Sequence, residues 1–278
     1  MTQPHKLGYR YRELFAQLEQ KRQGAFIPFV TIGDPNKEQS IEIIKTLIDN
    51  GADALELGIP YSDPSADGLT IQRATSRALT ANVNTDVCLD ILATIRRYNA
   101  DIPIGLLLYA NIVFARGIDR FYQQVNAAGV DSVLIADVPM REAARFKQAA
   151  ERHGIAPIFI APPNASEHTL KQVAAQSVGY TYVLARAGVT GTNVEAEQCS
   201  SSLLSALAEL SAAPPVLGFG ISSPTQVQNA IASGARGAIS GSAVVNIIAD
   251  NLDNQQLMLS KLADFTKAMK QATDISAM

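Results

Sequence analysis

Runs of apolar, often β-branched residues alternate with amphipathic segments along almost the whole chain. The first run, residues 25–33 (AFIPFVTIG), is apolar throughout, which is typical of a strand buried on both faces. Similar runs occur at residues 54–60, 103–110, 132–139, 156–163, 180–187, 214–222 and 237–243. The pattern therefore predicts about eight buried strands.

Amphipathic segments fill the spaces between these runs. Four apolar residues at helical spacing predict a first helix over about residues 9–22; they are Tyr11, Leu14, Phe15 and Leu18. Asp34 and Pro35 are expected to begin the next helix, as its N-cap and its early proline. Further helices are expected at residues 71–80, 86–99, 117–128, 140–153, 166–176, 199–211, 224–233 and 253–271.

Strands that alternate with helices over roughly 250 residues predict an α/β fold, a TIM (β/α)8 barrel with an extra N-terminal helix. The rival is a doubly wound open sheet, but VTIGDP stands after the first strand, where a glycine-rich dinucleotide fingerprint would be expected. The longest polar stretch, residues 188–202, follows the sixth strand, so in a barrel it is a loop over the site rather than a linker. We expect a single domain over residues 1–278.

An acidic residue interrupts the second apolar run. Glu56 lies within LELGIPYSDPSADG, and Asp67 lies in the polar part of the same stretch. A carboxylate inside a strand is costly unless it is used or paired, so the two residues are candidate catalytic acids in different environments. The structural alternatives are that Glu56 is salt-bridged and that Asp67 caps the helix that begins near Leu69.

Other catalytic chemistries lack their residues at the predicted strand ends. No lysine lies on a predicted strand, which disfavours a Schiff-base mechanism. The three histidines lie in the tail and in helices, so no strand-end metal site is expected. Both cysteines lie outside the strands. Of the catalytic chemistries considered, acid–base catalysis by carboxylates is the one whose residues are present at the predicted strand ends.

Small residues follow the last two predicted strands, in GFGIS (218–222) and SGSA (240–243). Their amides, close to helix N-termini at the usual phosphate corner of a barrel, predict a phosphate site, to which GVTG (188–191) can add. The alternative is that these glycines only form tight turns. Apolar residues at other strand ends are available to line a pocket; they are Phe29, Leu107, Leu134 and Ile160.

Two further residues near the end of the sixth strand have both a structural and a functional interpretation. Tyr182 alternates with Leu184, so it either packs in the core or gives Glu56 a hydroxyl partner. Arg186 either pairs with a loop carboxylate or steadies the loop that begins at Gly188.

The composition narrows the class of protein further. The net charge is −3, so no basic surface indicates nucleic acid. No segment has the length of a membrane span, and the N-terminus lacks the apolar core of a signal peptide. Two distant cysteines are typical of free thiols in a reducing compartment, so the cytoplasm is the expected location.

The stretch LELGIPYSDPSADG resembles the signature of the tryptophan synthase alpha chain family. The likeness runs from about Tyr9 almost to the C-terminus and includes, in order, GAFIPFVTIGDP, PIGLLLYANIVF, SVLIADVP, APIFIAPPNA, RAGVTG, GFGIS and GAISGSAV. The resemblance implies a TIM barrel that cleaves indole-3-glycerol phosphate to indole and glyceraldehyde 3-phosphate. This is a retro-aldol reaction without metal, Schiff base or other cofactor.

The resemblance also implies roles for individual residues. Glu56 would be the general acid–base, and Asp67 would offset positive charge on the indole nitrogen. Tyr182 would help to place the Glu56 carboxylate, and Thr190 would bond to Asp67 when its loop closes. Phosphate would lie against Gly191, Gly220, Gly241 and Ser242. Indole would lie against Phe29, Leu107, Leu134 and Ile160.

The family further implies a partner, a beta chain that uses pyridoxal phosphate, in an alpha2beta2 hetero-tetramer whose contact includes the Asp63–Pro64 loop. Two alternatives stay open: a stand-alone lyase that is active without a partner, and a non-catalytic phosphate-binding allosteric subunit. Ser65 and Leu69 depart from the family pattern. Neither change removes a catalytic group, but both can loosen the loop that carries Asp67.

Overall fold

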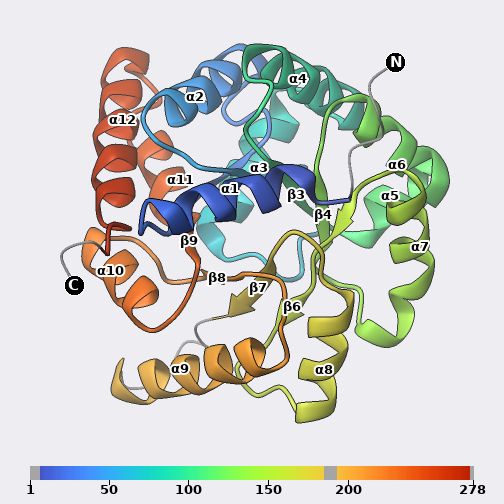
Figure 1. Ribbon diagram of the computed structural model, residues 1–278. Helices are drawn as coiled ribbons and strands as arrows, with labels where there is room; N and C mark the ends of the chain where they lie inside the picture. Colours follow the sequence, from blue (N-terminus) through green and yellow to red (C-terminus); the bar gives the residue numbers. More distant parts are fainter. Residues whose placement is uncertain (1–6, 185–192, 276–278) are drawn as a thin grey trace.

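A single curled sheet of parallel strands forms the centre of the molecule (Figure 1). The structure, a computed structural model, describes residues 7–184 and 193–275. The strands are β1 (Ala25–Thr31), β2 (Leu55–Gly58), β3 (Ile104–Leu108), β4 (Ser132–Ile135), β5 (Ala156–Pro157), β6 (Ile160–Ala161), β7 (Thr181–Leu184), β8 (Pro215–Gly218) and β9 (Gly237–Ser240). Their order across the sheet is β5-β4-β3-β2-β1-β9-β8-β7-β6.

The two edges of this sheet are consecutive pieces of one stretch of chain, so the sheet closes on itself. Between β5 and β6, the amide of Ile158 donates to the carbonyl of Val133 at 3.0 Å. The next carbonyl, that of Phe159, accepts from the amide of Tyr182 at 3.1 Å. The fifth predicted strand therefore bonds to its neighbours on both sides, and the predicted TIM barrel is confirmed.

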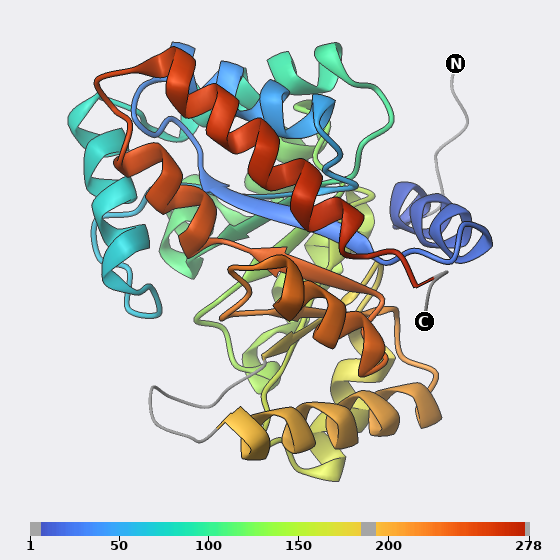
Figure 2. The ribbon, with the colours of Figure 1, turned by 90° about the vertical axis from the view of Figure 1, so that its left-hand side faces the viewer.

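Helices surround the barrel (Figure 1). They are α1 (Tyr9–Gln20), α2 (Lys37–Asp49), α3 (Leu69–Thr80), α4 (Thr85–Tyr98), α5 (Ala110–Arg116), α6 (Ile118–Ala127), the 3₁₀ turn η1 (Met140–Glu142), α7 (Ala144–Arg152), α8 (Glu167–Gln176), α9 (Asn193–Glu209), α10 (Pro224–Ala232), α11 (Ser242–Ala249) and α12 (Gln255–Gln271). The extra N-terminal helix, α1, lies across the end of the barrel where the strands begin (Figure 2). Within the described ranges we find no helix with the length and apolarity that crossing a bilayer requires.

The predicted start of α2 was wrong by two residues. The N-cap is Asn36, whose side chain accepts from the amide of Gln39 at 3.0 Å. Asp34 is instead buried, and its carboxylate forms a bidentate ion pair with Arg77 of α3. Arg77 Nε donates to Oδ1 at 2.7 Å, and Nη2 donates to Oδ2 at 2.8 Å. Asp34 and Pro35 therefore lie in the loop before the helix, and the carboxylate ties that loop to α3.

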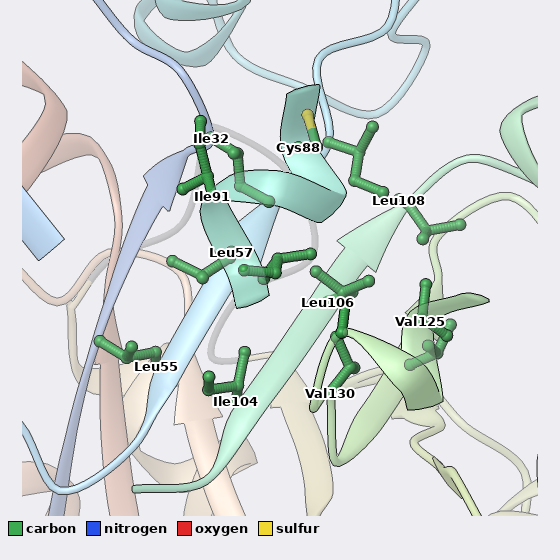
Figure 3. Close-up of a cluster of buried hydrophobic side chains, with 14 of the residues drawn as sticks. Ile32, Leu55, Leu57, Cys88, Ile91, Ile104, Leu106, Leu108, Val125 and Val130 are labelled. Carbon is green, nitrogen blue, oxygen red and sulfur yellow. The ribbon is translucent and has the colours of Figure 1, made fainter. Parts of the chain in front are cut away.

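Alternation along the strands divides the core into an outer and an inner part. Outward residues of β2 and β3 pack beneath α4, where Leu57 and Leu106 lie close to Ile91 (Figure 3). Inward residues of β1, such as Ile27 and Phe29, form a separate cluster inside the barrel. Three buried residues of α1 complete that inner cluster at the amino end of the strands: Tyr11, Phe15 and Leu18.

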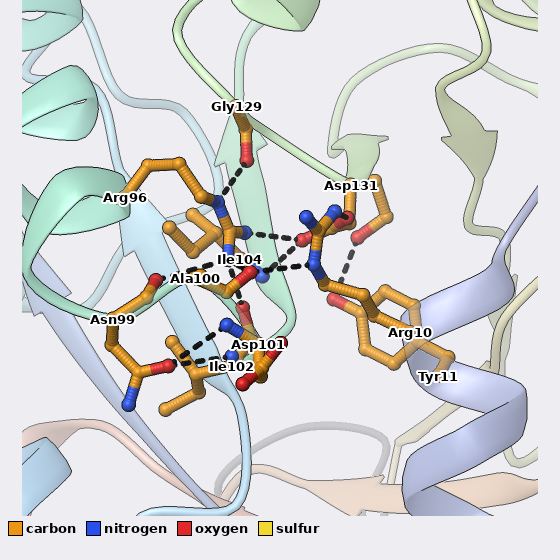
Figure 4. A network of polar contacts seen from close by, with 11 residues as sticks. Arg10, Tyr11, Arg96, Asn99, Ala100, Asp101, Ile102, Ile104, Gly129 and Asp131 are labelled. Carbon is orange, nitrogen blue, oxygen red and sulfur yellow. Dashed lines mark hydrogen bonds and ion pairs between the residues drawn. The ribbon is translucent and has the colours of Figure 1, made fainter. Parts of the chain in front are cut away.

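A polar network anchors α1 to the barrel (Figure 4). The carboxylate of Asp131 accepts from Arg10 of α1 and from Arg96 of α4, both at 2.7 Å. The same carboxylate accepts from the amide of Ile104 at 2.8 Å, and Arg96 also donates to the carbonyl of Gly129 at 3.0 Å. Because these groups lie at the amino ends of β3 and β4, the network fixes the helix against the base of the barrel.

Candidate active site

Glu56 is a buried acid that points into the barrel. Its neighbours Leu55 and Leu57 belong to the outer core, so the residue between them faces inward. The side chain is 2% exposed, and the hydroxyl of Tyr180 donates to its Oε1 at 3.0 Å. Burial raises the pKa of Glu56 to about 7, and the Tyr180 hydrogen bond opposes this rise. Near neutral pH, such a carboxyl can both give and take a proton.

The salt-bridge alternative for Glu56 finds no support. Among the side chains of residues 7–184 and 201–275, no lysine, arginine or histidine pairs with it. Its hydrogen-bond partner in this part of the chain is a neutral hydroxyl. A phenol stabilises the carboxylate less than an ion pair would, which is why the effect of burial on the pKa prevails.

Two interpretations of Tyr182 were open, core packing or a hydroxyl partner for Glu56, and among the described residues the hydroxyl that bonds to Glu56 is that of Tyr180. Both tyrosines are buried and face the barrel interior. The ring and hydroxyl of Tyr182 lie against Gly218 of β8, where they leave no room for a Cβ atom. The alternation that drew attention to Tyr182 applies equally to Tyr180, which lies two residues earlier and immediately before β7. This alternation was the signal that could have found Tyr180.

Asp67 lies half-buried in the loop between β2 and α3. The hydroxyl of Tyr109 accepts from the amide of Ala66 at 3.1 Å and also hydrogen-bonds to the Asp67 carboxylate. Burial raises the pKa of Asp67, whereas the Tyr109 hydrogen bond lowers it. The N-cap of α3 is Gly68, without a side-chain cap, so the alternative that Asp67 caps this helix is wrong.

The two residues that depart from the family pattern flank this acid. Ser65 is exposed, and Leu69 is 70% exposed at the first position of α3. Their side chains therefore reach the surface of the loop, and neither belongs to the buried core around Glu56.

The four residues expected to hold an apolar ring do lie together. Phe29 and Leu134 belong to the inner cluster of the barrel, and Leu107 and Ile160 pack against it. Leu107 and Leu134 are register partners on β3 and β4. The ring of Phe29 lies against Gly58, where an added Cβ would be only 2.8 Å from Cζ. These residues thus form an apolar wall inside the barrel, and one of them, Phe29, is the register partner of Glu56.

The candidate phosphate residues lie after β8 and β9, two neighbouring strands. Gly220 has φ +81°, and an added Cβ would meet no atom within 4 Å, so its backbone borders open space. Gly241 is the N-cap of α11, which begins at Ser242, and no side chain caps the first amides of this helix. These amides and the positive end of the helix dipole suit an anion.

Three further residues that the sequence analysis assigned to the site lie outside the described residues: Arg186, Thr190 and the phosphate candidate Gly191. Within the described ranges, no group of three or more His, Cys, Asp or Glu side chains is arranged to hold a metal ion.

The fold and the buried acid define the class: a TIM-barrel protein with a carboxyl group suited to acid–base chemistry in an apolar chamber. The family model described as "Tryptophan synthase alpha chain" matches residues 15–274. Curated tryptophan synthase alpha chains from Vibrio cholerae and Pectobacterium atrosepticum are 60% and 57% identical to this chain. These matches cover 96% and 95% of this chain, and 99% and 98% of the relatives. The chain belongs to the tryptophan synthase alpha chain family.

Solved structures agree with this assignment. Tryptophan synthase subunit alpha from Legionella pneumophila is similar with a TM-score of 0.86 and 29% identity, over 95% of this chain and 98% of the other. A tryptophan synthase complex from Pyrococcus furiosus contains a chain with a TM-score of 0.79 and 31% identity, over 89% of this chain and 98% of the other.

Proposed function

We propose that the chain cleaves indole-3-glycerol phosphate to indole and glyceraldehyde 3-phosphate, with Glu56 as the general acid–base. The observation that carries the proposal is the buried Glu56 carboxyl, whose pKa is raised to about 7 inside an apolar chamber. Membership of the tryptophan synthase alpha chain family supports the substrate and the carbon–carbon lyase reaction.

The reaction needs one group that both gives and takes a proton. Indole is a poor carbon leaving group until its ring carbon C3 is protonated. Glu56 gives its proton to that carbon and, as a carboxylate, takes the proton of the adjacent glycerol hydroxyl. The carbon–carbon bond then breaks, its electron pair restores the indole ring, and the hydroxyl oxygen becomes the aldehyde of glyceraldehyde 3-phosphate. Such a group works best when its pKa is near the working pH.

Asp67 has the complementary role in this proposal. Protonation of the ring carbon places positive charge on the indole nitrogen, and an ionised carboxylate beside that nitrogen stabilises the charge. Asp67 is less buried than Glu56 and lies in the loop after the same strand, where Tyr109 supports its ionised form. Thr190 would bond to Asp67 on loop closure, as the resemblance implies.

The remaining residues bind the two ends of the substrate. Indole lies against the wall formed by Phe29, Leu107, Leu134 and Ile160. Phosphate lies against the backbone of Gly220 and Gly241 and the start of α11 at Ser242, with Gly191 as a further contact. Tyr182 lines the chamber, and Arg186 steadies the loop that follows β7.

We further propose that the chain docks on a tryptophan synthase beta chain in an alpha2beta2 hetero-tetramer, through a surface that includes the Asp63–Pro64 loop. Similarity to a chain of the tryptophan synthase complex from Pyrococcus furiosus supports a partner of this kind. We also propose that residues 1–278 form one TIM-barrel domain and that the chain functions in the cytoplasm.

Release of indole and glyceraldehyde 3-phosphate from indole-3-glycerol phosphate tests these proposals, with the chain alone and with a beta chain. We expect slow release by the chain alone and a steep rise with the partner. No release in either condition by correctly folded protein would overturn the proposed reaction. Full turnover by the chain alone, without any gain from the partner, would overturn the proposed assembly.

A further inference from the structure

Two tyrosines connect the helix at the base of the barrel with Glu56. Tyr11 of α1 is fully enclosed, and its ring centroid lies 5.3 Å from that of Tyr180, with the planes tilted by 55°. Tyr180 in turn donates its hydroxyl hydrogen to Glu56 Oε1 at 3.0 Å. A continuous path of contacts therefore runs along the barrel interior, from α1 to the candidate acid.

Tyr11 itself is held on several sides. Its hydroxyl hydrogen-bonds with Ser132 Oγ of β4 at 2.9 Å. One face of its ring lies against Gly179, the residue before Tyr180, where an added Cβ would be 3.0 Å from Cδ2. Gly179 also has φ +95°, a conformation that favours glycine. Tyr11 thus contacts both the ring of Tyr180 and the backbone that leads into it.

The helix that carries Tyr11 is fixed at the neighbouring residue. Arg10 forms an ion pair with Asp131 at 2.7 Å, and Asp131 precedes Ser132 in the chain (Figure 4). Two consecutive residues of α1 therefore bond to two consecutive residues at the start of β4. This double attachment sets the position of the Tyr11 ring relative to the strands.

We propose that Tyr11 is a positioning residue for the lyase reaction, because its ring holds Tyr180 in the orientation that donates to Glu56. The inference rests on the proposed function of Glu56. Without the Tyr11 ring, the Tyr180 ring can turn away, and the hydrogen bond to the carboxylate becomes weaker. That bond favours the ionised form of Glu56, so its loss raises the pKa of the acid.

The test compares Tyr11→Leu and Tyr11→Met with Tyr180→Phe, and with a double variant that combines Tyr11→Leu with Tyr180→Phe. The readouts are kcat and KM for indole-3-glycerol phosphate across pH, and the titration of the ¹³C-labelled Glu56 carboxyl without substrate. We expect Tyr180→Phe to raise the Glu56 midpoint by about one pH unit, since a hydrogen bond to a charged group is lost. Both Tyr11 truncations should raise it in the same direction by a smaller amount, and lower kcat more than they change KM.

Two variants separate positioning from ordinary packing. Phe15→Leu truncates another buried ring one turn along α1; it should lower the melting temperature without moving the Glu56 midpoint. Tyr11→Phe keeps the ring and should stay close to the wild-type midpoint. Because Tyr11 acts through Tyr180, the double variant should show the same midpoint as Tyr180→Phe.

The inference is overturned if folded Tyr11 truncations leave the Glu56 midpoint unchanged while Tyr180→Phe raises it. It is also overturned if Phe15→Leu moves the midpoint as much as the Tyr11 truncations do. The carboxyl titration needs no turnover. A chain that failed to cleave indole-3-glycerol phosphate would therefore disprove the proposed function, while the link between Tyr11 and Glu56 would still be measured.

Discussion

Phe29 and Glu56 are register partners on β1 and β2, and both side chains point into the barrel. An aromatic residue is therefore the strand neighbour of a carboxyl group that is 2% exposed, and its ring extends to Gly58 on the same strand as that group. The ring cannot stabilise the charged form of the acid by donating a hydrogen bond, as water would. This relationship gives a physical reason why the protonated form of Glu56 persists to near-neutral pH.

The raised pKa of Glu56 should be visible in the stability of the fold. Its ordinary value is 4.5, and burial raises it to about 7, so the folded state binds more protons between these limits. The Glu56 contribution to the free energy of unfolding should therefore fall as pH rises through this window. Glu56→Gln removes that dependence. The free energy of unfolding of the variant, relative to that of wild type, should therefore rise by roughly 3 kcal/mol between about pH 4 and pH 8. Urea unfolding of both proteins at several pH values measures the difference, and parallel curves would contradict the assignment.

Asp67 should matter through its charge. Asp67→Asn keeps the size of the side chain but removes the carboxylate, so kcat for indole-3-glycerol phosphate should fall by about 100- to 1,000-fold. The matched control is Asp63→Asn in the same loop, which removes an exposed carboxylate four residues earlier. In the isolated chain this control should change kcat less than about threefold. Equal losses in the two variants would point to disturbance of the loop instead.

The Asp131 network should contribute to the stability of the fold. Asp131→Asn leaves Arg10 and Arg96 without their carboxylate partner in a partly buried site. Breaking such a pair should lower the free energy of unfolding by about 3 to 5 kcal/mol. Asp90→Asn is the control, because Asp90 is 70% exposed and pairs with Lys37 only at 3.5 Å; it should cost less than about 1 kcal/mol. Denaturant unfolding of the two variants should separate these values clearly.

The barrel could be predicted from the sequence because its strands are apolar on both faces. Glu56 was predictable for the same reason, since an acid inside such a run has a cost that needs an explanation. The four residues of the apolar wall followed from their places at strand ends. In each case the signal lies in a few consecutive residues.

Features that depend on distant contacts could not be predicted. Asp34 looked like a helix cap, but its partner Arg77 lies 43 residues further along the chain. Alternation predicted which side chains near β7 face inward but not how far along the barrel axis each one lies. It therefore did not single out Tyr180 as the residue that bonds to Glu56. The range of helix α11 was not predicted because its apolar residues, SAVVNIIA, begin one residue after β9 and continue an apolar run.

The most direct test of the central claim is the rate of indole release from indole-3-glycerol phosphate by Glu56→Gln beside wild type, at equal concentrations and with the fold checked by circular dichroism. The glutamine keeps the volume of the side chain but cannot carry a proton between the glycerol hydroxyl and the ring carbon. A loss of about 100- to 10,000-fold is expected for removal of a general acid–base. A folded Glu56→Gln variant that releases indole at close to the wild-type rate would contradict the account.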